Sequence, residues 1–155
     1  MDSNNYRIAL SFPIAELSDR VLSLLAAHEI SCTSSAGDKC HYIGDERQEE
    51  FVEANVRLCA WHVCSALSGW NATTEFDSED HVAISLSPGI PSDARRNTLL
   101  GENVRDWICA HVALRALRVI TADKALVEAA EEMADMARQR TLMMLCASDM
   151  LRKVG

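Results

Sequence analysis

The chain has 155 residues, 48% of them hydrophobic and 25% charged, which excludes disorder over most of its length and fits one globular domain. A net charge of −8 at pH 7 argues against specific nucleic-acid binding, because the few basic residues do not gather in one segment. No apolar run is long enough for a membrane span or a signal peptide, so we expect an intracellular protein with reduced cysteines.

The first segments predict a short strand followed by a helix. Residues 6–12 alternate in polarity, which is the period of a half-buried strand. The apolar face of this strand consists of Ile8, Leu10 and Phe12. Pro13 suits the first turn of a helix, and apolar residues then recur at helical spacing, so a helix is predicted at about 13–29. Residues 31–44 are rich in serine, glycine and cysteine and are predicted to form a loop.

A long amphipathic helix is predicted next. The acidic run at residues 45–50 suits a helix N-terminus, where the helix dipole favours negative charge. Apolar residues then recur at three- and four-residue steps between residues 52 and 70. We therefore expect a helix at about 46–69 and a polar loop at 71–80.

The second half repeats the order of a strand and two helices. Residues 81–87 alternate, with one apolar face formed by Val82, Ile84 and Leu86. After a break at Pro88–Pro91, a helical stripe extends from Leu100 to Leu117 and ends near Ile120. The stripe of the last helix, predicted to extend to about residue 152, contains Leu126, Ala130, Met133, Ala137, Met144 and Leu151.

These elements predict a mainly α fold, with a four-helix core and two short β-strands in a single domain, residues 1–155. The core should contain five residues from the two strongest stripes: Val56, Val63, Val104, Ile108 and Leu114. Residues 6–70 and 81–152 have the same strand-helix-helix order, and IALSF matches VAISL at an offset of 74. A second match, of Asn55-Val56-Arg57 with Asn103-Val104-Arg105, has an offset of 48, so a duplication of the two halves stays open.

No motif in the sequence indicates catalysis or a metal. Glutamate is nowhere followed by histidine three residues later, and HExxH, GxSxG and glycine-rich phosphate loops are absent. We therefore predict no catalytic residue, no metal ligand, no cofactor and no enzymatic activity. His62 and His111 are expected to be partly buried, hydrogen-bonded histidines, although Cys59 and His62 share a helix face. Four cysteines lie in apolar helical patterns and should be buried: Cys59, Cys64, Cys109 and Cys146.

The last predicted helix is unusually rich in methionine. The residues concerned are Met133, Met136, Met143, Met144 and Met150. They either fill gaps in the core or meet another subunit, because methionine is common in both places. The tryptophans Trp61, Trp70 and Trp107 raise the same question, since tryptophan often anchors interfaces.

Two stretches of the chain carry a resemblance to a known class of proteins. The stretch DHVAISLSPGIPSDARRNTLLGENVRDWICAHVALRAL combines an alternating strand, a proline, a polar break and a long helix. The opening YRIALSFPIAELSDRVLSLL has the same strand-proline-helix order. Together they resemble small head–tail connector or adaptor proteins of tailed phages and prophages of Bacteroides-type bacteria. The chain departs from that pattern in having more cysteine and alanine.

The resemblance implies a virion structural protein of the phage neck, located in the virion and the host cytoplasm. It implies a ring-like homo-oligomer with portal or tail proteins as neighbours and no catalytic residues. The alternatives are a bacterial cytosolic helical adaptor or regulatory protein without a virion role, and a small-molecule-binding or catalytic bundle that uses cysteine and histidine.

The two predicted strands suggest where a partner would bind. A two-stranded sheet is marginal in water, so the strands must pack on the helices and leave an edge open to a neighbouring chain. The alternative is that the strands pair only with each other beneath the bundle. The candidate interface comprises Ile8, Leu10, Phe12, Val82, Ile84, Leu86, Trp70, Met143 and Met144.

Overall fold

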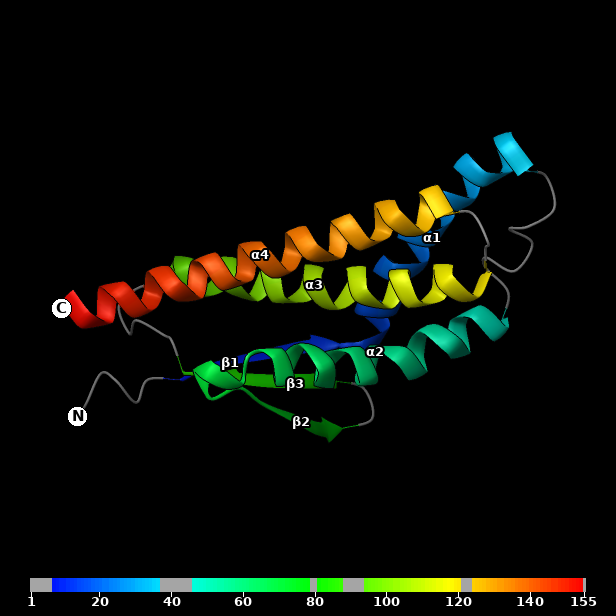
Figure 1. Cartoon of the computed structure of the whole chain (residues 1–155). Coiled ribbons are helices and arrows are strands. Elements are labelled where there is room, and N and C mark those ends of the chain that lie inside the picture. Colours follow the sequence, from blue (N-terminus) through cyan, green and yellow to red (C-terminus); the bar gives the residue numbers. More distant parts are fainter. Residues whose placement is uncertain (1–6, 37–45, 79–80, 88–93, 121–123, 155) are drawn as a thin grey trace.

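The computed structural model describes residues 7–36, 46–78, 81–87, 94–120 and 124–154 (Figure 1). The elements are β1 (Ile8–Pro13), α1 (Ile14–Ala36), α2 (Glu46–Ala66), the 3-10 turn η3 (Ser68–Trp70), β2 (Thr73–Ser78), β3 (His81–Leu86), α3 (Ala94–Ile120) and α4 (Lys124–Val154). The predicted mainly α class, with four helices and two short strands at β1 and β3, is confirmed.

The sheet contains a third strand in addition to the two predicted ones. β1 pairs antiparallel with β3, with Ile8 opposite Leu86 and Phe12 opposite Val82. β2 pairs antiparallel with the other side of β3, so β3 is the central strand in the order β1-β3-β2. The predicted loop at 71–80 is therefore wrong over residues 73–78. Thr73, Thr74 and Phe76 are good strand formers, and acidic residues are common on edge strands.

Two helix ends differ from the prediction. α1 continues to Ala36 instead of ending near residue 29, so Cys32 lies in a helix and not in the predicted loop. α2 ends at Ala66 and is followed by η3, where Asn71 has a φ of 53° in the left-handed region that asparagine tolerates. The backbone N–H of Ser87 donates to the carbonyl of Trp70 at 3.0 Å, which links η3 to the end of β3.

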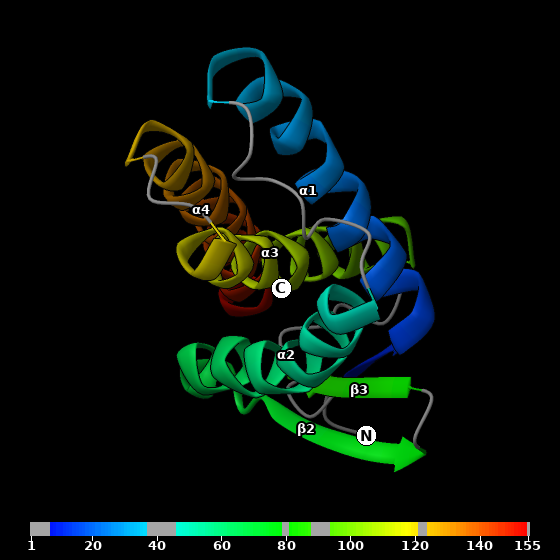
Figure 2. The same cartoon turned by 90° about the vertical axis from the view of Figure 1, so that its right-hand side faces the viewer.

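Helix α3 lies at the centre of the molecule. Figure 2 shows it surrounded by α1, α2 and α4, with the sheet beyond α2, and α3 contacts each of these helices. Its buried residues point in most directions around the helix axis, as expected for a helix with neighbours on several sides: Leu100, Val104, Trp107, Ile108, Cys109, Ala110, Val112, Ala113, Leu114, Ala116 and Leu117. The five predicted core residues are all buried, which confirms that expectation. Gly101 lets α3 pass close to β1, because a Cβ there would lie 3.1 Å from Leu10 Cδ2.

Helix α4 packs along α3 through mostly small side chains. Its buried residues are Ala130, Ala134, Ala137, Thr141 and Leu145. The Thr141 hydroxyl is satisfied within the helix, since it donates to the carbonyl of Ala137 at 2.9 Å. The predicted stripe is wrong at Met133, which is exposed, because the buried positions in this part of α4 are Ala130, Ala134 and Ala137. No helix in the described part of the chain is long and apolar enough to cross a membrane.

Candidate functional site

The structure buries four of the nine predicted interface residues. Ile8, Val82, Ile84 and Leu86 belong to the hydrophobic core, so their side chains are not available to a partner and this part of the prediction is corrected. The physical reason is that the apolar face of the sheet packs against the helices. Leu10 and Phe12 are half-buried and pack against the same core.

The sheet has open edges, as the sequence predicted, but β3 does not form one of them. β3 is paired on both sides, so its N–H and C=O groups serve β1 and β2. Within the described residues, the edges of the sheet are β1 and β2. A substitution in β3 therefore tests the stability of the sheet and not a contact with another chain.

The remaining three predicted interface residues differ in exposure. Trp70 and Met144 are half-buried and pack against the core. The Met144 carbonyl accepts a hydrogen bond from Arg96 Nη2 at 3.3 Å, and its sulfur accepts one from Asn103 Nδ2 at 3.0 Å. Met143, by contrast, is 72% exposed. Of these three, Met143 is the side chain most open to a partner.

The cysteines divide into buried and exposed thiols. Cys59, Cys64 and Cys109 are buried, as predicted, whereas Cys146 is exposed because it lies off the face of α4 that contacts α3. Burial raises the pKa of both Cys59 and Cys109 to about 12. These two thiols stay protonated near neutral pH and are poor nucleophiles. Cys40, in the predicted loop at 31–44, lies outside the described residues.

Two histidines from different helices meet face to face. The rings of His62 on α2 and His111 on α3 have centroids 4.8 Å apart and an interplanar angle of 5°. His111 is half-buried as expected, but His62 is exposed, which corrects the prediction for that residue. Parallel stacked rings do not direct their nitrogen lone pairs at one point. The described residues contain no group of three or more histidine, cysteine or acidic side chains that could hold a metal ion.

From the histidine stack we predict that the free energy of unfolding depends on pH. Burial, the neighbouring His62 and the positive charges of Arg115 and Arg118 all lower the pKa of His111. As the pH falls below about 6.5, the imidazole of His111 takes up a proton in the unfolded chain before it does so in the folded protein. The contribution of neutral His111 to the free energy of unfolding is therefore fully present above pH 6.5, and it is lost as the pH falls through the lowered pKa of the folded protein. We expect His111→Gln to reduce the loss of stability between pH 7 and pH 5, measured by urea unfolding.

The matched control for this prediction is His81→Gln. His81 is exposed at the start of β3 and is not a member of the stacked pair. The control should retain the pH dependence of the wild type. An identical pH dependence in the wild type and in His111→Gln would contradict the role of the stack.

Two separate hollows lie between α3 and α4, one of about 320 Å³ and one of about 450 Å³, and α1 contributes to the lining of the first. The first is lined by Arg20, Leu24, Asp106, Cys109, Ala110, Met133, Met136, Ala137 and Arg140. The second is lined by Arg95, Arg96, Leu99, Met143, Met144 and Ala147. We refer to these residues together as the α3/α4 groove.

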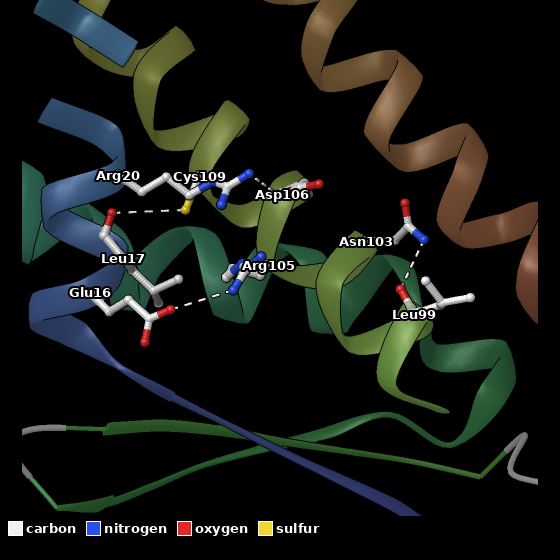
Figure 3. A network of polar contacts seen from close by, with 8 residues as sticks. All are labelled: Glu16, Leu17, Arg20, Leu99, Asn103, Arg105, Asp106 and Cys109. Atoms are coloured by element: carbon white, nitrogen blue, oxygen red, sulfur yellow. Dashed lines mark hydrogen bonds and ion pairs between the residues drawn. The ribbon is translucent and has the colours of Figure 1, made fainter. Parts of the chain in front are cut away.

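Polar contacts between α1 and α3 hold one wall of this groove in place (Figure 3). Arg20 Nη2 lies 2.6 Å from Asp106 Oδ1, and Arg105 Nη1 lies 3.4 Å from Glu16 Oε1. The thiol of Cys109 donates weakly to the carbonyl of Leu17 at 3.8 Å. These contacts fix the end of α1 that carries Arg20 against the middle of α3.

A second exposed apolar surface lies on α2. Leu58 is 47% exposed and Trp61 is 56% exposed, and we call these two residues the α2 patch. Six large hydrophobic side chains are exposed in the described part of the chain: Leu58, Trp61, Leu99, Met133, Met136 and Met143. Two belong to the α2 patch and four to the α3/α4 groove, so exposed apolar surface is concentrated at two places. Neither Leu58 nor Leu99 was predicted as an interface residue.

The sequence matches no protein-family model, no curated protein and no solved structure. The functional conclusion therefore rests on the physical features of the two surfaces and on the resemblance described from the sequence.

Proposed function

We propose that this protein has no enzymatic activity and works by binding protein surfaces, including copies of itself. The observation that carries the proposal is the pair of exposed apolar surfaces, the α2 patch and the α3/α4 groove, which together contain all six exposed large hydrophobic side chains of the described residues. Tryptophan and methionine are enriched at protein interfaces, where they bury large areas and adapt their shape.

The narrower proposal is a virion structural protein at the neck of a tailed phage, with portal or tail proteins as neighbours. It is supported by the strand-proline-helix stretches of the sequence. Connector proteins act by assembly, and two separate binding surfaces are what a repeating assembly needs.

Light scattering after size-exclusion chromatography, together with electron microscopy, tests the assembly. We expect a closed ring of several copies that shifts towards monomers on dilution. A protein that stays monomeric at high concentration would contradict the ring and favour a monomeric adaptor. The virion role is tested by mass spectrometry of phage particles from a strain that encodes the chain, since a neck protein must be present in them at several copies per particle.

A further inference from the structure

We infer that the seam between α2 and α3 forms a binding site for a tetrahedral oxyanion, the phosphate group of a small ligand. The side chains that bind it are His62, His111 and Arg115. Binding is coupled to protonation of the two histidines, so the site is occupied at acidic pH. It lies outside both hollows of the α3/α4 groove and does not depend on the proposed assembly.

The three side chains meet because α2 and α3 run in opposite directions along this seam. His62 of α2 stacks on His111 of α3, and Asn55, earlier on α2, contacts Arg115, later on α3. His111 and Arg115 are four residues apart, so they lie on one side of α3. His62 and Arg115 are exposed and His111 is half-buried, so a ligand in solution can reach all three.

The guanidinium of Arg115 is held in place by a buried amide. Asn55 is only 8% exposed, and its Oδ1 accepts a hydrogen bond from Arg115 Nε at 2.9 Å. Within the described residues, no carboxylate pairs with Arg115. The N–H groups on its two Nη atoms are therefore left to donate to two oxygens of one oxyanion.

The two imidazoles also have donors to offer. Neither His62 nor His111 makes a hydrogen bond with another described residue, so the hydrogen bonds expected for them from the sequence are not formed there. A neutral imidazole has one N–H donor and a protonated one has two. The oxygens of a phosphate lie at separate positions, so these donors need not point at a single atom as metal ligands must.

The core of the bundle keeps the two rings together. Cys59 and Val63, near His62 on α2, and Val112, next to His111 on α3, have no exposed surface. Moving α2 away from α3 would expose these apolar side chains to water, which is unfavourable. Repulsion between two protonated rings is therefore relieved by a bound anion and not by separation of the helices.

The surroundings of His111 supply positive charge. Burial lowers the pKa of His111 most, and His62 of α2 and Arg115 and Arg118 of α3 lower it further. Among the described residues, the charged groups that shift this pKa are thus all positive. The thiol of Cys59 on α2 is neutral, because burial raises its pKa to about 12.

The other two helices that contact α3 do not balance this charge. Glu131 of α4 already forms an ion pair with an arginine at 3.0 Å. Glu16 and Arg20 of α1 shift the pKa of Cys109 and not that of His111. The counter-charge for a protonated histidine pair therefore comes from solution. By linkage, an anion that binds there raises the pKa of His111 and takes up protons with it.

Calorimetric titration of the full-length chain with sulfate tests the site, at about pH 5.5 and about pH 7.5 and at constant ionic strength. Sulfate is tetrahedral and keeps both negative charges at the two pH values, so only the protonation of the protein changes. We expect binding at the lower pH, with proton uptake, and about tenfold weaker binding at the higher pH. At the lower pH, His62→Gln and Arg115→Gln should each weaken binding about tenfold.

Two further probes distinguish the sources of the phosphate group. Inorganic phosphate and phenyl phosphate are titrated in the same way at the lower pH. Leu58 is exposed four residues before His62 on α2, where it can contact an organic group attached to the phosphate. Tighter binding of phenyl phosphate would assign the site to an organic phosphate, and equal binding would assign it to free phosphate.

The control is Arg138→Gln, which removes one positive charge from α4, where Arg138 pairs with Asp135 at 2.8 Å. It should bind sulfate as the wild type does, and circular dichroism melts verify that all variants fold. Absence of binding at about pH 5.5, or binding that is equally tight at about pH 7.5, would overturn the site. Equal weakening by Arg138→Gln and Arg115→Gln would also overturn it, because the effect would then be one of net charge. None of these outcomes would alter the proposed assembly.

Discussion

Replacing Ile108 with alanine should lower the free energy of unfolding by about 2–5 kcal/mol. Ile108 has no exposed surface and lies in the middle of α3, the helix that contacts α1, α2 and α4. The substitution removes three buried carbon atoms and leaves a cavity. Because packed helices surround this position on several sides, they cannot all move inward to close the cavity. Urea unfolding followed by circular dichroism measures the change.

Leu99→Ala on the same helix is the matched control. Leu99 is 45% exposed in the α3/α4 groove, so its truncation should cost much less than that of Ile108. Equal losses at the two positions would mean that α3 is not the centre of the core.

The strands show why the sequence predicted some elements and not others. β1 and β3 each have one buried apolar face, and the alternation of Ile8 and Leu10, or of Val82 and Ile84, makes that face visible in the sequence. β2 has the sequence TTEFDS, which contains a single large apolar residue. Its pairing depends on backbone hydrogen bonds to β3, and these leave no periodic signal.

The predicted stripe of α4 is correct at Ala130 and Ala137 but wrong at Met133, and the error has a physical reason. Hydrophobicity alone ranks methionine above alanine, so Met133 was placed in the stripe. In the structure α4 lies against α3 through Ala130, Ala134 and Ala137, whose small side chains permit a close approach of the two helices. The exposed methionines were then left on the side that forms the groove.

The α2 patch could have been recognised from the sequence. The predicted stripe of that helix includes Cys59 and Val63, which are buried, and Leu58 and Trp61 fall between its positions. Large apolar residues off the core-facing stripe of a helix are candidates for a second contact. The groove could not be found in this way, because it requires the relative placement of α1, α3 and α4, which no local pattern contains.

Because β3 is the central strand of the sheet, the backbone at Ala83 is sensitive to substitution by proline. Ala83 lies opposite Ser11 of β1 and opposite Glu75 of β2. Every backbone N–H in a central strand faces one neighbour or the other, and for this reason proline is rarely found there. The sheet also supplies Val82 and Ile84 to the same core as the helices.

Ala83→Pro should therefore destabilise the whole protein and not merely the sheet. Losing the N–H of residue 83 leaves an acceptor unsatisfied, at about 1–3 kcal/mol, and the ring disturbs the strand between its two neighbours. Because the sheet and the helices share one core, we expect helical circular dichroism to be lost together with the sheet at a lower urea concentration. Ala83→Val is the control, since it keeps the N–H and favours a strand, and it should fold with near wild-type stability. A proline variant with unchanged stability would show that β3 is not paired on both sides.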